Sequence, residues 1–130
     1  MNFLKIGGKA WNVNVTELSR NFNVLYTENT VRSLAVGAPM HLDPLGTFHG
    51  HKIKIERKGS DLKAFDDLYD YVSQPRRKGI PVEVVFNQTT IKYDAYISNG
   101  EQALRVIKGS KVYWDELEIN IIPMKAQVLP

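Results

Sequence analysis

The sequence contains no cysteine and no long apolar run, and these two absences exclude several classes of protein. Without cysteine among its 130 residues, the chain has neither a disulfide framework nor a zinc site built on thiolates. A membrane-spanning helix needs about 20 consecutive apolar residues, and no stretch of the sequence provides them. Residues 1–9 also lack the apolar core and small-residue cleavage site of a secretory signal, so we expect none.

Excess charge is also small. The net charge is +3, with 43% hydrophobic and 24% charged residues, which is ordinary for a globular protein. A dedicated nucleic-acid-binding protein usually carries a larger and more clustered positive charge. The length indicates a single domain over residues 1–130, with an extended loop or arm at about 27–47.

Apolar and polar residues alternate over much of the chain, which predicts strands. The predicted strands are residues 3–6, 11–16, 22–26, 52–58, 82–86, 91–97, 103–107 and 113–121. Residues 22–26 are either a strand of their own or a continuation of 11–16 after a bend near Ser19. Between them, residues 61–73 carry apolar side chains at helical spacing, with Ser60 and Asp61 as candidate N-caps. We therefore predict a mainly β fold, in which two packed antiparallel sheets form a sandwich or barrel with one helix at 61–73.

Three turns are predicted from residue type. Asn87-Gln88 lies between two predicted strands, and Gly109 lies in another turn, at 108–111. Asn99-Gly100 is the strongest signal, because a type I′ turn requires positive φ at both central positions. It predicts a hairpin that joins strand 91–97 to strand 103–107.

The segment 27–47 has little regular pattern but several apolar residues. They are Leu34, Val36, Met40, Leu42 and Leu45. A segment of this length without regular structure is uncommon in a compact domain. It is either a loop folded back onto the core or an arm whose apolar residues contact another subunit.

No motif indicates catalysis, and we expect no enzyme, cofactor, metal or small-molecule substrate. Asp66, Asp67 and Asp70 are interpreted as the solvated face of the helix. His49 and His51, with His41 nearby, could in principle bind a metal, but a solvated pair is the stronger interpretation. We expect the two tryptophans, Trp11 and Trp114, to pack on the sheets.

A basic group offers an alternative function. Arg76, Arg77 and Lys78 follow the helix, and Lys52 and Lys54 share one face of a predicted strand. Such residues could contact phosphates. The alternative is therefore a small nucleic-acid-binding β-barrel.

Several stretches carry a resemblance to a known family. They are residues 8–13, 45–48, 65–75, 93–101 and 114–124. In their order, this chain resembles the tube-type fold of tailed-phage tails, whose members include tail tube proteins, the N-terminal domain of distal tail proteins and the type VI secretion tube protein. More narrowly, it is similar to small tail or baseplate proteins encoded in prophages of Gram-positive bacteria.

The resemblance implies a structural protein of a phage tail or baseplate, located in the virion tail and assembled in the host cytoplasm. It implies a ring of six copies that forms through sheet edges and the apolar arm. Partners would be further copies and other tail proteins, with no membrane, and with nucleic acid only as the passing genome.

Overall fold

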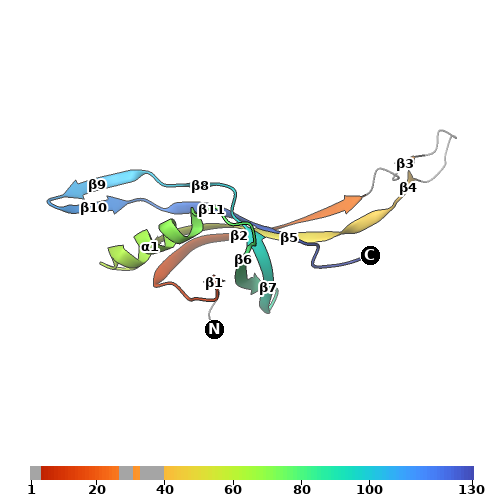
Figure 1. The fold of residues 1–130 in the computed structure, drawn as a ribbon, viewed down its shortest axis with the longest axis horizontal. Helices are drawn as coiled ribbons and strands as arrows, with labels where there is room; N and C mark the ends of the chain where they lie inside the picture. The colour runs from red at the N-terminus through yellow and green to blue at the C-terminus, as the bar shows by residue number, and fades with distance from the viewer. Residues whose placement is uncertain (1–3, 27–30, 33–39) are drawn as a thin grey trace.

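The structure, a computed structural model, describes residues 4–26, 31–32 and 40–130. As predicted, it is mainly β with one helix, α1 (Leu62–Val72) (Figure 1). The strands are β1 (Leu4–Ile6), β2 (Val13–Tyr26), β3 (Val31–Arg32), β4 (Met40–His41), β5 (Pro44–Arg57), β6 (Ile80–Phe86), β7 (Thr89–Tyr96), β8 (Gly100–Glu101), β9 (Leu104–Lys108), β10 (Lys111–Trp114) and β11 (Leu117–Pro123). No helix in the described part of the chain is long and apolar enough to cross a membrane.

One large antiparallel sheet has the strand order β1-β6-β7-β11-β5-β2, with β8 added beside β11. β11 joins its two halves, because Leu117–Ile121 pair with β5 whereas Ile122 and Pro123 pair with β7. The sheet therefore passes from one layer to the other within a single strand.

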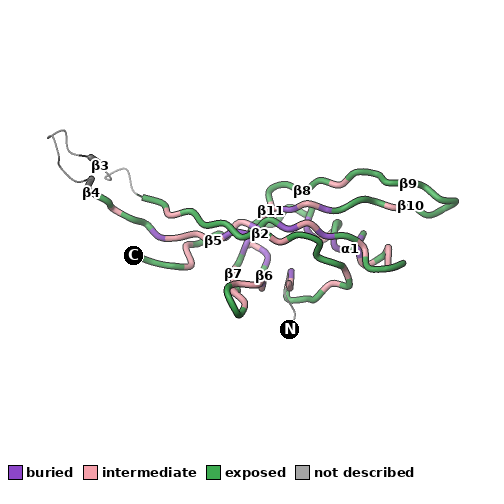
Figure 2. The backbone as a smooth tube through the Cα atoms, turned by 180° about the vertical axis from the view of Figure 1, so that it is seen from behind, coloured by how far each residue is buried: buried purple, intermediate pink, exposed green. Residues whose placement is uncertain are grey.

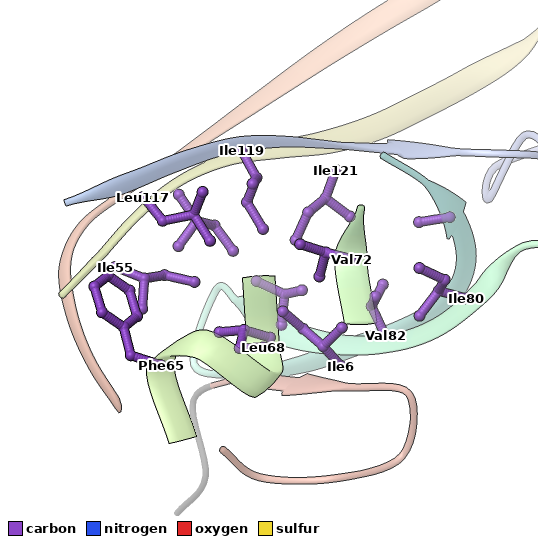
Figure 3. Close-up of a cluster of buried hydrophobic side chains, with 13 residues drawn as sticks. Ile6, Ile55, Phe65, Leu68, Val72, Ile80, Val82, Leu117, Ile119 and Ile121 are labelled. Atoms are coloured by element: carbon purple, nitrogen blue, oxygen red, sulfur yellow. The ribbon is translucent and has the colours of Figure 1, made fainter. Parts of the chain in front are cut away.

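The core lies between these two halves and α1. Figure 3 shows side chains from the helix, from β11 and from β6 pointing into a common cluster. Ile53 and Ile55 of β5 and the alternating Leu117, Ile119 and Ile121 of β11 are fully buried, so the predicted facing of both strands is confirmed. Burying one such side chain stabilises the fold by about 1.5–3 kcal/mol.

The helix also begins where the sequence predicts. The Asp61 carboxylate accepts a hydrogen bond from the Ala64 backbone N–H at 3.0 Å, which satisfies one of the free donors of the first turn. Hydrogen bonds from the Asn12 side chain and then from Ala64 hold the pKa of Asp61 below its usual value. Phe65, Leu68 and Val72 face the core.

Strands β2 and β5 form one long hairpin of two 14-residue strands, called the long hairpin below. The sequence suggested separate strands at 11–16 and 22–26 or one strand bent near Ser19. The structure has one continuous β2, whose register shifts between Val15 and Glu17 instead. Residues 44–47, assigned to the irregular arm by the sequence analysis, begin β5.

The predicted Asn99-Gly100 turn is wrong. Neither residue has positive φ, whereas the other two predicted turns each contain a residue that does, Asn87 with φ 51° and Gly109 with φ 61°. β7 is paired with β6 along one edge, and β11 occupies its other edge at Ala95 and Tyr96, the residues nearest the predicted turn, where strand 103–107 would have to pair. Gly100 instead pairs with Ile119 across β8 and β11, where a Cβ would lie 3.3 Å from the Ile119 Cγ2.

Candidate assembly surfaces

Two hairpins extend from the core in opposite directions. Figure 1 shows the long hairpin running to the end that bears β3 and β4, and β9 with β10 running to the other end. The second pair, called the short hairpin, forms a two-stranded sheet of its own. The molecule is therefore elongated, with its core in the middle.

The far half of the long hairpin exposes large apolar side chains. Phe22 is 72% exposed, and Leu42 and Leu45 are 53% and 52% exposed. Of the other residues predicted for an interface, Leu34 and Val36 lie outside the described residues, and Met40 is described only as part of the β4 backbone. Leu42 and Leu45 thus lie where solvent or a partner can reach them.

The C-terminal segment docks on this hairpin, which the sequence did not indicate. The Thr47 backbone N–H donates to the Val128 carbonyl at 2.8 Å. The Gln127 side chain accepts from the His49 N–H and donates to the His49 carbonyl, each at 2.9 Å. Gly46, at φ 151°, leaves room for the segment, since a Cβ there would lie 2.7 Å from the Val128 carbonyl oxygen. This glycine was the only available signal.

The histidines are not the solvated pair that the sequence suggested. His51 is only 1% exposed, and its Nδ1 lies 2.7 Å from the Tyr93 hydroxyl. Burial lowers the pKa of His51 and raises that of Tyr93. The His49 ring packs edge-on against Phe86 at 5.0 Å between centroids. Within the described residues, no three histidine or carboxylate side chains gather as metal ligands.

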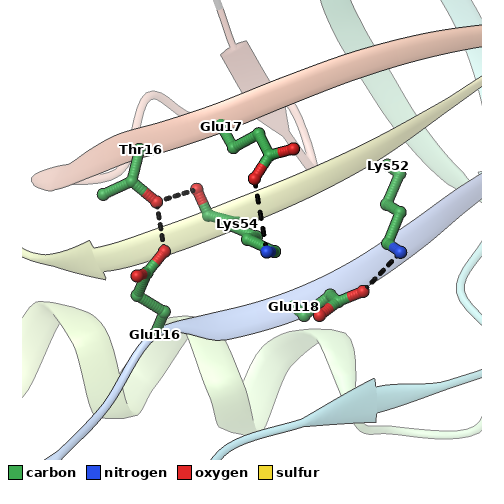
Figure 4. Close-up of polar contacts among 6 residues, drawn as sticks. All are labelled: Thr16, Glu17, Lys52, Lys54, Glu116 and Glu118. Carbon is green, nitrogen blue, oxygen red and sulfur yellow. Dashed lines mark hydrogen bonds and ion pairs between the residues drawn. The ribbon is translucent and has the colours of Figure 1, made fainter.

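The lysines of the proposed nucleic-acid surface are paired with carboxylates. Lys52 contacts Glu118 at 2.7 Å and Lys54 contacts Glu17 at 3.2 Å (Figure 4). On the same face, the Thr16 hydroxyl hydrogen-bonds to the Glu116 carboxylate. This face is therefore a mixed-charge surface rather than a basic one.

The basic segment after the helix is partly committed to the fold. The Arg76 guanidinium donates to the Tyr71 carbonyl at 2.6 Å and lies 4.1 Å from the centre of the Tyr71 ring. It thereby satisfies a carbonyl of the last helical turn. Arg77 and Lys78 are exposed.

The short hairpin, like the docked C-terminal segment, was not predicted from the sequence. Every residue of β9 is exposed, and Ile107 is 58% exposed (Figure 2). Trp114, predicted to pack on a sheet, is 38% exposed. Trp11 packs against the helix rather than on a sheet alone, since its ring lies 5.5 Å from that of Tyr71 in α1 between centroids.

The chain matches no protein-family model, no curated protein and no solved structure. The resemblance to tail proteins therefore depends on the sequence motifs alone.

Proposed function

We propose that this protein is a structural subunit of a phage tail or baseplate, which assembles as a ring or onto one through its projecting hairpins and sheet edges. The observation that carries the proposal is the pair of opposed hairpins with exposed apolar side chains. A monomer gains nothing from holding such side chains in water, whereas contact with a second subunit buries them.

The sheet edges support the same function. β2 is an edge strand of the large sheet, and it is 14 residues long. A long edge strand presents unpaired backbone groups that invite pairing with another chain. A contact between two different surfaces forms a closed ring when the rotation that relates neighbouring subunits divides 360° evenly. In such a ring the edge of each subunit is covered by the next subunit.

The ring size comes from the sequence resemblance, which implies six copies. Native mass spectrometry over a concentration series tests it directly. We expect a discrete hexamer, or stacked multiples of one, to grow as the protein concentration increases. A chain that remains monomeric at every concentration and captures no tail protein would contradict the proposal.

The long hairpin supplies the first variants. Phe22→Ser combined with Leu45→Ser removes two exposed apolar side chains without touching the core, so assembly should weaken at least tenfold while the melting temperature changes little. Tyr96→Ser is the matched control, because Tyr96 is 47% exposed but lies on β7. Equal loss of assembly in both variants would exclude a specific role for the long hairpin.

The nucleic-acid alternative is tested in the same samples. A labelled oligonucleotide whose mobility shifts at micromolar protein and low salt, and no longer shifts at high salt, would favour it. The pairing of Lys52 and Lys54 with carboxylates leads us to expect no shift.

A further inference from the structure

The short hairpin combines exposed apolar residues with positively charged residues only. Between Leu104 and Trp114 the sequence has three cationic residues, Arg105, Lys108 and Lys111, and no acidic residue. Within the part of the chain that the structure describes, none of the three forms an ion pair. Lys108 and Lys111 face each other beside the turn. Because side chains alternate between the two faces of a strand, the exposed Val106 shares the face of these lysines, whereas Ile107 lies on the opposite face.

This hairpin lacks the support that an isolated pair of strands needs. β9 and β10 pair only with each other, and a lone two-stranded hairpin is marginally stable in water. Its root is tied to β5, where the Arg57 guanidinium lies 4.8 Å from the Tyr113 ring centre. Its tip extends past the helix (Figure 1), so a partner that covers the tip would also stabilise it.

The opposite charge lies on the exposed side of α1. Asp66 and Asp70 are exposed, and the helix repeat places them on one face with Tyr69 and Ser73. Like charges four residues apart destabilise a helix, and burial together with the neighbouring Asp70 and Asp67 raises the pKa of Asp66. A cationic partner would relieve this repulsion.

A hollow of mixed polarity lies at the end of this helix face. It has a volume of about 250 Å³ and is lined by the helix end, the segment after β7, and β11. Its lining combines apolar residues, among them Tyr69, Pro75 and Ile97, with polar ones, among them Gln74, Ser98 and Asn99. Tyr69 and Ser73 border it and belong to the helix face that bears Asp66 and Asp70. The result is a partly apolar groove next to an acidic helix face.

We propose that the tip of the short hairpin of one copy docks into this groove on a second copy, with Val106 facing the hollow and Lys108 and Lys111 against Asp66 and Asp70. The hairpin is cationic and the helix face is acidic, so the two surfaces are complementary in charge. A neutral or cationic partner would not complement the cationic hairpin in this way. The two surfaces differ, so the contact is head-to-tail and can extend into a ring or a helical array. The inference rests on the proposed self-assembly and assigns a second interface to it.

The absence of cysteine from the sequence makes crosslinking a clean test. Ser110→Cys lies at the hairpin tip and Ser98→Cys lines the groove, and neither replacement alters a charge. Mixing the two variants with a short bis-maleimide should give a 110–98 crosslinked dimer in at least tenfold higher yield than mixing Ser110→Cys with Gln88→Cys. Gln88, exposed in the β6–β7 turn, is the matched control.

Charge exchange provides the second test. Lys108→Glu with Lys111→Glu, and separately Asp66→Lys with Asp70→Lys, should each weaken self-association at least tenfold in sedimentation velocity. Mixing the two variants should restore association, because each altered surface then meets its complement. Circular dichroism checks that both variants remain folded.

The outcomes separate this inference from the proposed function. Loss of assembly in the long-hairpin variant, with no 110–98 crosslink and no effect of charge exchange, would overturn the inference alone. A wild-type chain that never self-associates would overturn the inference, and one that also captures no tail protein would overturn both. Oligonucleotide binding that disappears in Lys108→Glu/Lys111→Glu, without any self-association, would overturn both and assign the hairpin to nucleic acid.

Discussion

At the scale of single residues, His51 is the most consequential polar group of the core. Its imidazole is buried at the junction of the long hairpin and β7, hydrogen-bonded to Tyr93 and close enough to His49 and Arg20 to feel their charge. Burial contributes most to disfavouring the protonated ring, His49 and Arg20 add to the effect, and a hydrogen bond with the Val85 backbone opposes it. The pKa of His51 is therefore lowered in the folded protein.

This lowered pKa predicts a loss of stability in mild acid. The unfolded chain takes up a proton on His51 near its ordinary pKa of about 6.5, before the folded protein does, so protonation favours unfolding. The contribution is complete above that value and is lost progressively as pH falls toward the lower folded pKa. Melting temperatures from pH 7.5 to pH 5 should decrease, and the decrease should be smaller in His51→Gln.

His49→Gln is the control for this prediction. His49 is only partly buried and lies against Phe86 at the protein surface, so its replacement should leave the acid dependence largely intact. The same decrease in His51→Gln as in the wild type would show that other groups control acid stability.

A second residue-scale prediction concerns two asparagines. Asn87 has φ 51°, and its side-chain oxygen accepts from the Arg20 guanidinium at 2.7 Å, whereas Asn99 has no positive φ. Left-handed backbone costs an ordinary L-residue about 1–2 kcal/mol. Asn87→Ala should therefore lower the free energy of unfolding by about 1–2 kcal/mol, and Asn99→Ala by less than about 0.5 kcal/mol. Urea denaturation measures both, and the opposite ranking would restore the Asn99-Gly100 turn.

At the scale of elements, alternation and helical spacing predicted the parts that contact the core. Ile53 and Ile119 alternate with polar neighbours and are buried, and α1 begins one residue after its Asp61 cap. Which strands pair with one another was not predictable. The turn preference of Asn99-Gly100 is local and carries no information about which strand pairs with β7. β9 and β10 look like half-buried strands for the same reason, since sequence alternation does not reveal whether the apolar face meets a core or solvent.

Gly46 gives the element-scale prediction for the long hairpin. Gly46→Ala adds a Cβ 2.7 Å from the Val128 carbonyl oxygen and places it at a φ of 151° that L-residues avoid. The C-terminal segment should therefore detach, and amide hydrogens of Thr47 and Gln127 should exchange at least tenfold faster. Hydrogen exchange with mass spectrometry measures this protection.

Gly8→Ala separates the two causes. Gly8 also has positive φ, at 75°, but nothing lies within 4 Å of the added Cβ. It should cost backbone strain of about 1 kcal/mol without changing exchange at Thr47. Equal exchange at Thr47 in wild type and Gly46→Ala would mean that the segment is not held at this glycine.

At the scale of the whole molecule, the candidate surfaces were only half predictable. The apolar residues Leu42 and Leu45 were selected from the sequence, while the short hairpin and the groove beside α1 were not. The groove joins residues from the helix, from the segment after β7 and from β11, and only the folded chain brings these segments together. The composition did not indicate these charged surfaces, because the sequence as a whole carries a net charge of only +3.

The opposed hairpins predict a monomer larger than its length suggests. A compact chain of 130 residues has a radius of gyration of about 14 Å, and a core with two projecting hairpins must exceed it. Small-angle scattering on the Phe22→Ser/Leu45→Ser variant, separated as a monomer by size exclusion, measures the radius without interference from assembly. Because this variant keeps both hairpins, a value near 14 Å would mean that the hairpins fold back on the core, and the exposed side chains on which the assembly proposal rests would then already be covered.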